Sequence, residues 1–391
     1  MVFGLSRFDE KIDRMQTASV KWERTEAIFG EKDLLPMWVA DMDFRPPKAV
    51  IDALKKRVEH GIFGYTFIPE SVNSAIQTWL HKRHRWTIES DTLLYANSVV
   101  EAISMAIQTF TAPGDKVLLQ SPVYTPFFDM IEKNDRIVAN SPLKLTNGRY
   151  EIDFEHFEEE VKNGCKLFLL CNPHNPGGRV WSRDELQRIA EVCVKYNCLI
   201  VSDEIHSDLV YQSHKHYPIA SISDEVLEMT ITCLSPSKTF NLAGLQASAV
   251  VIQSKEKREQ FLKTQRRHGF FSLNTFGILA METAYQHGEA WLEELLDYLE
   301  ENKQFALSYL AENLPQLSCM EPDGTYLLWI DCRKLGQTDK EIRRRLIEKG
   351  KVALEPGTKY GLGGEGFIRL NFACPKEMLA DALERLKRAL G

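Results

Sequence analysis

Residues 166–206 read KLFLLCNPHNPGGRVWSRDELQRIAEVCVKYNCLIVSDEIH. The stretch begins with an apolar run, Lys166–Cys171, and nears its end with a second one, Cys198–Ser202. Between the two runs, Arg183–Tyr196 has the apolar spacing of an amphipathic helix. A strand, a helix and a strand in succession predict a right-handed crossover and a mostly parallel sheet with helices on both faces.

The same alternation extends in both directions along the chain. Further buried strands are predicted at Lys116–Gln120, Thr230–Leu234 and Ser248–Ile252. From about residue 285 the pattern changes to helices and strands at Glu289–Leu314, Tyr326–Asp331, Asp339–Glu348, Phe367–Phe372 and Lys376–Leu390. We therefore expect an α/β fold with a large, mostly parallel α/β/α sheet domain, residues 46–285. A smaller α+β domain, residues 286–391, would follow it, with an N-terminal segment, residues 1–45, associated with the small domain.

The composition excludes several classes of protein. The chain has 391 residues, of which 44% are hydrophobic and 26% charged, which is typical of a globular protein. Its 48 basic and 55 acidic residues give a net charge of −7, which argues against binding to nucleic acid. The apolar runs are too short to span a membrane, and the N-terminus carries charges where a signal peptide needs an apolar core. The eight cysteines form no Cys-x-x-Cys pair, so we expect reduced thiols and a cytoplasmic location.

The histidines give little indication of a metal site. His206, His214 and His216 stand near one another, but no carboxylate or cysteine lies at ligand spacing. We expect one site residue and two loop residues, and no metal. His81 and His84 lie in the basic run His-Lys-Arg-His-Arg, which predicts a solvated helix face.

Polar groups follow each of the predicted strands. In an open α/β sheet, ligands bind beyond the carboxyl ends of the strands. The segments at these ends are Asn172–Gly178, Asp203–His206, Ser235–Lys238 and Ser121–Tyr124, and Asn97–Val100 precedes a helix. Together they supply a lysine, a carboxylate, an amide, hydroxyls, an aromatic ring and a helix N-terminus.

These groups match the parts of pyridoxal 5'-phosphate (PLP). A lysine can form a Schiff base with an aldehyde. A carboxylate beside a protonated pyridine nitrogen keeps the ring an electron sink. The free N–H groups of a helix N-terminus bind phosphate, and an aromatic ring can stack on the cofactor.

Seven motifs in order along the chain carry a family resemblance. They are Trp38–Phe44, His60–Tyr65, Ser121–Phe127, Asn172–Pro176, Ser202–His206, Ser235–Asn241 and Leu354–Gly357. Over nearly its whole length the chain resembles fold-type I PLP-dependent enzymes of the class I/II aminotransferase superfamily. It resembles most closely the cystathionine β-lyase (C–S lyase, MalY/PatB-type) branch. The resemblance implies the PLP-dependent transferase fold.

The resemblance also implies roles for particular residues. Lys238 would be the Schiff-base lysine and later the general base, and Asp203 would pair with the pyridine N–H. Asn175 would hydrogen-bond the phenolic oxygen of the cofactor, and Tyr124 would stack on the ring; both would also border the substrate. The amides of Val99 and Val100 and the hydroxyl of Ser235 would bind the phosphate.

Further implied roles concern the substrate and the assembly. Arg369 would hold the substrate α-carboxylate as a bidentate fork, and the Ala40 backbone would touch the same carboxylate. Tyr65 would reach the phosphate in a neighbouring subunit, which implies a homodimer with shared active sites. Two positions depart from the common aminotransferase pattern: His206 replaces a tyrosine near the cofactor, and Gln246 replaces a basic residue at the phosphate.

The expected reaction is β-elimination from L-cystathionine or a related cysteine S-conjugate, which yields pyruvate, ammonia and a thiol. Two alternatives remain open: an aminotransferase, which shares the removal of the Cα proton, and a regulator or binding protein on the same fold. The sequence leaves the preferred thiol, the physiological substrate and any regulatory partner undetermined. A dinucleotide site is rejected, because Gly361–Gly366 matches G-x-G-x-x-G but precedes a strand pattern, Phe367–Phe372, where the motif needs a helix.

Overall fold

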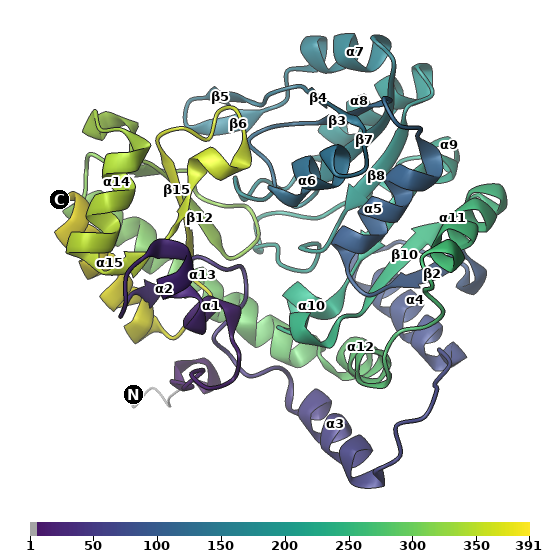
Figure 1. Ribbon diagram of the computed structural model, residues 1–391, viewed down its shortest axis with the longest axis horizontal. Helices are drawn as coiled ribbons and strands as arrows, with labels where there is room; N and C mark the ends of the chain where they lie inside the picture. The colour runs from purple at the N-terminus through teal and green to yellow at the C-terminus, as the bar shows by residue number, and fades with distance from the viewer. Residues whose placement is uncertain (1–5) are drawn as a thin grey trace.

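A computed structural model describes residues 6–391 (Figure 1). Its largest sheet has seven strands in the order β2-β10-β9-β8-β7-β3-β4. The strands are β2 (Leu93–Ala96), β3 (Lys116–Leu119), β4 (Ile137–Asn140), β7 (Cys165–Cys171), β8 (Leu199–Asp203), β9 (Thr230–Leu234) and β10 (Ser248–Ile252). The ladders from β4 through β9 are parallel, whereas β10 runs antiparallel to both β2 and β9. The sheet is therefore mostly parallel, as predicted.

Helices cover both faces of this sheet (Figure 1). The helices of this part of the chain are α3 (Lys48–His60), α4 (Glu70–His84), α5 (Val99–Phe110), α6 (Pro126–Glu132), α7 (Phe154–Lys162), α8 (Arg183–Lys195), α9 (Asp224–Glu228), α10 (Pro236–Thr239), α11 (Lys255–Arg267) and α12 (Thr275–His287), of which α3 packs on α12 and not on the sheet. Along β7, Leu167 and Leu169 pack with the buried side of α5, whereas Phe168 and Leu170 pack with α7 and α8. Because successive side chains of a strand point to opposite faces, this apolar run serves two cores at once.

A second sheet of four strands forms the other part of the molecule. Its order is β11-β12-β15-β14, and its ladders are antiparallel. The elements are β11 (Ser318–Cys319), β12 (Leu327–Asp331), β14 (Glu355–Pro356), β15 (Phe367–Asn371), α13 (Glu289–Asn313), α14 (Asp339–Arg345) and α15 (Lys376–Leu390). The long helix α13 links this part to the large sheet domain (Figure 1).

The N-terminal segment packs against this second part. It contains α1 (Val20–Glu23), α2 (Thr25–Phe29) and β1 (Leu35–Pro36), and β1 pairs in parallel with β13 (Val352–Ala353). Phe29 packs edge-on against Trp38, and both rings join a small buried cluster that includes Ala353. Residues at the start of the chain are thus fixed by residues near its end.

The remaining elements are short. The hairpin β5 (Lys144–Thr146) and β6 (Arg149–Glu151) lies outside the large sheet. Single turns of 3-10 helix are η1 (Arg7–Asp9), η2 (Ser90–Thr92), η3 (Ile219–Ser221), η4 (Ala243–Leu245), η5 (Arg333–Leu335) and η7 (Gly357–Tyr360), and η6 (Leu346–Gly350) is a π-helical turn. Within residues 6–391, no helix combines the length and apolar character needed to cross a bilayer.

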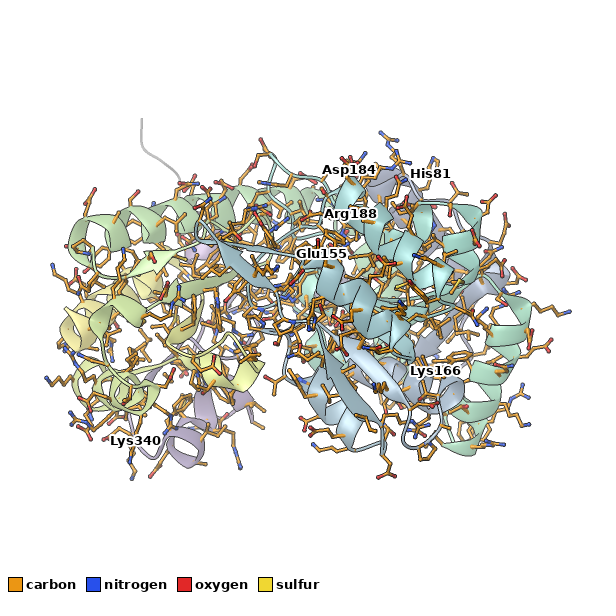
Figure 2. All side chains as sticks on the ribbon, turned by 90° about the horizontal axis from the view of Figure 1, so that it is seen from above. His81, Glu155, Lys166, Asp184, Arg188 and Lys340 are labelled. Carbon is orange, nitrogen blue, oxygen red and sulfur yellow. The ribbon has the colours of Figure 1, made fainter. Side chains whose placement is uncertain are left out.

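Most predicted elements agree with the structure to within one or two residues. The strands β9 and β10 and the helix α15 have the predicted bounds, and Ser182 and Glu185 form a capping box at the start of α8. The strands β2 and β4 had not been predicted. The prediction for His84 was wrong: His81 projects from the surface (Figure 2), but His84 is 7% exposed and bonds to the buried Asp208. Its position on α4 faces the core instead of the solvent.

Candidate active site

A cavity of about 410 Å³ lies at the carboxyl ends of the central parallel strands. Its walls come from the large sheet, from the second sheet and from the segment before α3. The structure brings ten predicted site residues to this cavity: Ala40, Val99, Val100, Tyr124, Asn175, Asp203, His206, Ser235, Lys238 and Arg369. Tyr65 is not brought there in its own chain, because its side chain is fully exposed in the segment between α3 and α4.

Lys238 lies in α10, one turn beyond the end of β9. Ser235 caps this short helix by accepting a hydrogen bond from the N–H of Ser237, and its hydroxyl donates to the Ala247 carbonyl, 2.8 Å away. The Nζ of Lys238 donates to the Ala40 carbonyl at 2.6 Å. Desolvation in the cavity lowers the pKa of Lys238 to about 8, so a neutral amine is accessible near physiological pH.

Asp203 is the last residue of β8, and its side chain is 3% exposed. Its Oδ1 accepts a hydrogen bond from the N–H of Ile205 at 3.1 Å, and no basic side chain of residues 6–391 forms an ion pair with it. Burial raises the pKa of this carboxyl to about 7. A buried carboxylate without a cationic partner is costly, so the site favours a ligand that brings a positive charge or an N–H donor.

Arg369 is a buried cation on the facing wall. It lies in β15 and is 5% exposed. Its Nη1 donates to Oδ1 of Asn175 at 3.0 Å, and its Nη2 donates to the Trp38 carbonyl at 2.7 Å. Its Nε has no hydrogen-bond partner among the described residues, and no carboxylate there pairs with the guanidinium. Because a buried cation without an anion is costly, the geometry favours a ligand carboxylate at this position.

The opposite end of the cavity offers backbone N–H groups and hydroxyls. Ser98 caps α5 by accepting a hydrogen bond from the N–H of Glu101, and Val99 and Val100 form the first turn. The first N–H groups of an α-helix have no acceptor within the helix, so they can bind an anion. Gln246 also lines this end, with a left-handed backbone (φ 51°).

Two aromatic residues border the space between these groups. Tyr124 packs edge-on against Phe127 in the segment after β3, and burial raises the pKa of its hydroxyl to about 12. His206 packs edge-on against Tyr326, and burial lowers its pKa to about 3, so its ring is neutral. The Nδ1 of His206 is buried without a partner in the described structure. This position therefore offers a neutral nitrogen where the common pattern has a phenol.

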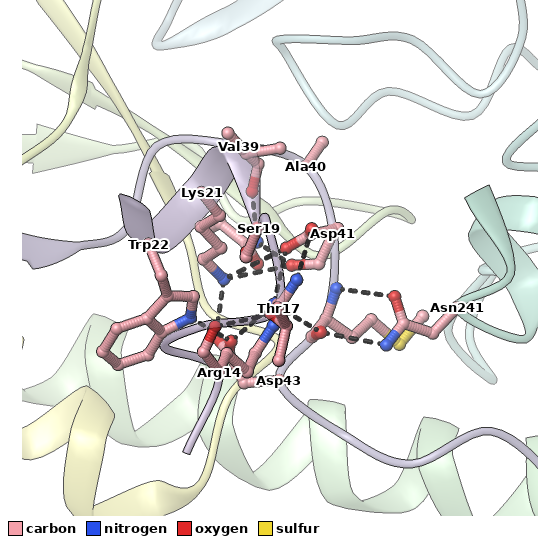
Figure 3. Close-up of polar contacts among 12 residues, drawn as sticks. Arg14, Thr17, Ser19, Lys21, Trp22, Val39, Ala40, Asp41, Asp43 and Asn241 are labelled. Atoms are coloured by element: carbon pink, nitrogen blue, oxygen red, sulfur yellow. Dashed lines mark hydrogen bonds and ion pairs between the residues drawn. The ribbon is translucent and has the colours of Figure 1, made fainter. Parts of the chain in front are cut away.

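A buried ionic network holds the segment that carries Ala40 (Figure 3). Lys21 is fully buried and donates to Oδ2 of Asp43 at 2.6 Å, and Arg14 donates to Oδ1 of the same carboxylate at 2.8 Å. Arg14 also pairs with Asp41, at 2.9 Å. These contacts lower the pKa of Asp43, although burial alone would raise it. The network had not been predicted, although its acidic residues belong to the motif Trp38–Phe44.

Three further residues of the cavity wall had not been predicted. Glu355, Lys359 and Tyr360 lie in β14 and η7, and the guanidinium of Arg369 lies 5.4 Å from the centre of the Tyr360 ring. The motif Leu354–Gly357 is the sequence feature that points to this wall, because it places Glu355 directly before a Pro-Gly turn.

The remaining sequence candidates lie elsewhere. A strand, β15, follows Gly361–Gly366 directly, so this glycine-rich loop lacks the helix that a dinucleotide site needs. His216 bonds to the buried Glu204, and His214 lies 3.0 Å from Asp323. Across residues 6–391 no group of three or more His, Cys, Asp or Glu side chains is arranged to hold a metal ion.

Comparison with known proteins identifies the family. Residues 32–386 match the family described as Aminotransferase class I and II. The chain belongs to this family. It is 49% identical over 384 residues to the cystathionine beta-lyase PatB of Bacillus subtilis, covering 98% of this chain and 99% of that protein. The predicted resemblance to class I/II aminotransferases is therefore confirmed.

Solved structures of relatives have the same fold. Cystalysin from Treponema denticola, which contains pyridoxal 5'-phosphate, superposes with a TM-score of 0.96 at 35% identity over 99% of both chains. The PLP-bound C-S lyase from Staphylococcus hominis superposes with a TM-score of 0.91 at 33% identity over 98% of this chain and 99% of that one. The predicted fold type I architecture of the class I/II aminotransferase family is confirmed.

Proposed function

We propose that this protein is a PLP-dependent carbon–sulfur lyase that cleaves L-cystathionine or a related cysteine S-conjugate to pyruvate, ammonia and a thiol. One observation carries the proposal: the Lys238 amine shares a cavity with the buried carboxyl of Asp203 and the buried guanidinium of Arg369, neither of which has an ion-pair partner among residues 6–391. The identity of 49% to a cystathionine beta-lyase over almost the whole chain supports the same reaction.

The residues present fit pyridoxal phosphate. The carboxylate of Asp203 suits the protonated pyridine nitrogen, and the N–H groups of Val99 and Val100 suit the phosphate. The cavity of about 410 Å³ lies within the range of small-molecule sites, ~300–1,000 Å³. When bound, the cofactor supplies an electron sink for the charge left at Cα.

Further contacts would complete the cofactor site. The Ser235 hydroxyl lines the same cavity as Val99 and could share its donor between the Ala247 carbonyl and the phosphate. Tyr124 would stack on the ring, and the Asn175 amide would donate to the phenolic oxygen while its Oδ1 accepts from Arg369. His206 would border the ring as a neutral group, because burial lowers its pKa to about 3.

Lys238 would first attach to the cofactor aldehyde and then move the proton. Its amine is neutral over part of the physiological range, because desolvation lowers its pKa to about 8. When free and neutral, this amine would act as the base for the Cα proton of the substrate. The Ala40 carbonyl, 2.6 Å from Nζ, would hold the free amine in place.

Arg369 would fix the orientation of the substrate through its α-carboxylate. The two outer nitrogens of its guanidinium are held by Asn175 and the Trp38 carbonyl, so its plane is fixed before the substrate α-carboxylate arrives. The Ala40 backbone lines the same cavity and would border this carboxylate. A two-point clamp on the carboxylate would restrict rotation of the substrate about its N–Cα bond and so fix the orientation of the Cα proton relative to the Lys238 amine.

We propose that the protein acts as a homodimer with shared active sites. Tyr65 is fully exposed beside the exposed Ile62, Phe63 and Phe67, an apolar segment that a second copy of the chain would cover. Tyr65 of one subunit would then bind the phosphate in the other.

The division into residues 1–45, 46–285 and 286–391 stays a proposal, supported by the two sheets and by the β1–β13 pairing. The eight free thiols support a cytoplasmic location.

A test without a keto acid separates the lyase from an aminotransferase. Purified protein loaded with PLP is incubated with L-cystathionine, and pyruvate, ammonia and homocysteine are measured over many turnovers. Equal amounts of the three products support the proposal. If turnover requires an added keto acid and the amino group appears on it, the protein is an aminotransferase.

A further inference from the structure

Two charged residues of the cavity wall have no role in the reaction described above. Glu355 and Lys359 line the same cavity as Lys238, and the Nζ of Lys359 lies 2.8 Å from Oε2 of Glu355. Asp203, Lys238 and Arg369 are all assigned to the cofactor or to the α-amino acid group of the substrate. One negative and one positive charge therefore remain for another part of the ligand.

Glu355 projects to the same face as Arg369. The two residues are directly opposed in the antiparallel pair of β14 and β15. Opposed residues of an antiparallel pair point to the same side of the sheet, with their Cβ atoms roughly 4.5–5.5 Å apart. The side chain of Glu355 is 9% exposed. The side chains of Glu355 and Arg369 thus project from the same face of the sheet, and both line the cavity.

Lys359 has a fixed backbone at the mouth of the cavity. Its carbonyl accepts a hydrogen bond from the hydroxyl of Thr125 at 2.8 Å, which joins η7 to the large sheet domain. A Cβ on Gly357 would lie 2.0 Å from the carbonyl oxygen of Gly364, so only glycine allows the loop to close on itself here. The Lys359 side chain is 48% exposed and lines the cavity, so its charge is accessible to ligands.

We propose that Glu355 and Lys359 form a second binding site for a zwitterionic α-amino acid group on the thiol leaving group. Glu355 would bind the ammonium of that group, and Lys359 would bind its carboxylate. The preferred substrate is then a thioether with an amino acid group at each end, not an alkyl cysteine. The inference rests on the proposed function and specifies its substrate class.

Charge alternation explains why a pair suits a zwitterion. With the ligand bound, the charges of Glu355, Lys359 and the ammonium and carboxylate of the ligand each have a neighbour of opposite sign. The net charge of this cluster stays zero. A neutral alkyl thiol gains nothing from the pair, and a leaving group with a single charge meets one attractive and one repulsive partner. The pair therefore discriminates through the leaving group alone, while Arg369 treats all α-amino acids alike.

The test compares two substrates that share the cysteine part. Pyruvate release from L-cystathionine and from S-ethyl-L-cysteine is measured for the PLP-loaded wild type, Glu355→Gln and Lys359→Gln. We expect each variant to lower kcat/KM for L-cystathionine about 10-fold, a typical loss for one charged contact, and to change kcat/KM for S-ethyl-L-cysteine less than about twofold. Lys195→Gln, which removes an exposed ion pair with Glu158 away from the cavity, serves as the matched control.

A binding measurement provides a second readout. The Kd of L-cystathionine, measured by calorimetry on PLP-loaded Lys238→Ala, should rise about 10-fold when Lys359→Gln is added, and the Kd of S-ethyl-L-cysteine should not. Equal losses for both substrates, or no loss for either, contradict the second binding site while the lyase function stands. A wild type that releases pyruvate from neither substrate contradicts the proposed function itself.

Discussion

The Nζ of Lys238 donates a hydrogen bond to the carbonyl oxygen of Ala40, 2.6 Å away and 198 residues apart in the chain. The Tyr326 hydroxyl donates to the same oxygen at 3.0 Å. One backbone atom thus joins the large sheet domain, the second sheet and the N-terminal segment. Since Arg14 and Lys21 hold the next residue, Asp41, the position of the reactive amine depends on residues far from it (Figure 3).

The rate of cofactor attachment should depend on the protonation of Lys238. Because the pKa of this amine is lowered to about 8, cofactor-free protein should bind PLP covalently about tenfold faster per pH unit up to pH 8, and at a constant rate above it. Stopped-flow absorbance measures the rate, and borohydride reduction with peptide mapping locates the attachment. Pyridoxyl label on a different lysine would falsify the assignment.

Asp203→Asn should change how the stability of the cofactor-free protein depends on pH. In cofactor-free protein the pKa of Asp203 is raised to about 7, so its protonated form contributes stability below about pH 4 that is lost as the pH rises through 7. The unfolding free energy of the wild type minus that of Asp203→Asn should therefore fall by up to about 4 kcal/mol between pH 4 and 8. A difference that stays constant with pH would contradict the burial of this carboxyl.

With PLP bound, the same substitution should slow the removal of the Cα proton. A lost electrostatic contribution of this kind costs about 3–4 kcal/mol of barrier. Single-turnover rates with L-cystathionine measure the effect, and retention of the cofactor by Asp203→Asn is checked by its absorbance. A rate near that of the wild type would show that the ring nitrogen does not depend on Asp203.

Asp43→Asn should destabilise the protein strongly. The substitution leaves the fully buried Lys21 without its closest anion, and breaking a buried ion pair in this way costs about 3–5 kcal/mol. Because the pKa of Asp43 is lowered, its stabilisation is present at neutral pH and is lost as the pH falls below about 4. Urea unfolding at pH 7 tests this, with the exposed pair of Lys195 and Glu158 as control; Lys195→Gln should leave the unfolding free energy nearly unchanged.

Arg369→Lys should lower kcat/KM for L-cystathionine about 10- to 100-fold. A lysine keeps the charge but cannot bind Asn175, the Trp38 carbonyl and a carboxylate with one planar group. Steady-state pyruvate release measures the loss, and Arg333→Lys, at an exposed arginine, should leave it unchanged. If Arg369→Lys retains wild-type kcat/KM, the guanidinium does not clamp the substrate.

The shared-site homodimer can be tested by mixing subunits. Lys238→Ala should be inactive, and Tyr65→Phe should retain PLP less tightly. If Tyr65 acts across the dimer, a heterodimer of the two variants has one site with both substitutions and one with neither. Activity per heterodimer should then reach about half that of the wild-type dimer at limiting PLP. Heterodimers that form but are no more active than the parent mixtures would contradict the shared site.

The sequence was sufficient for the elements whose pattern is local. The strands β7 to β10 are short apolar runs, because both of their faces are buried, and the helix α8 carries its own capping box. Parallel strands bring their carboxyl ends to one edge of the sheet, so the order of residues along the chain was enough to group Asn175, Asp203 and Lys238.

The rest depended on contacts between distant residues. Lys21 and Asp43 are common residue types with no spacing that marks a buried pair. Glu355 reaches the cavity wall only because β14 places it opposite Arg369. A strand of two residues, such as β14, is too short to show the alternating apolar pattern by which strands are predicted. His84 was misjudged because its basic neighbours suggested solvent, whereas its own side of α4 faces Asp208.

The β1–β13 pairing and the contacts of Asn371 determine when the site can be completed during synthesis. The Asn371 amide donates to the carbonyls of Val39 and Asp41, on either side of Ala40. The segment that carries Ala40 is thus held by a strand that is made much later. A nascent chain that already contains Lys238 and the whole large sheet still lacks the support for Ala40. Firm retention of the cofactor is therefore expected only after Asn371 has been made, and chains stopped before residue 371 should emerge as apoprotein.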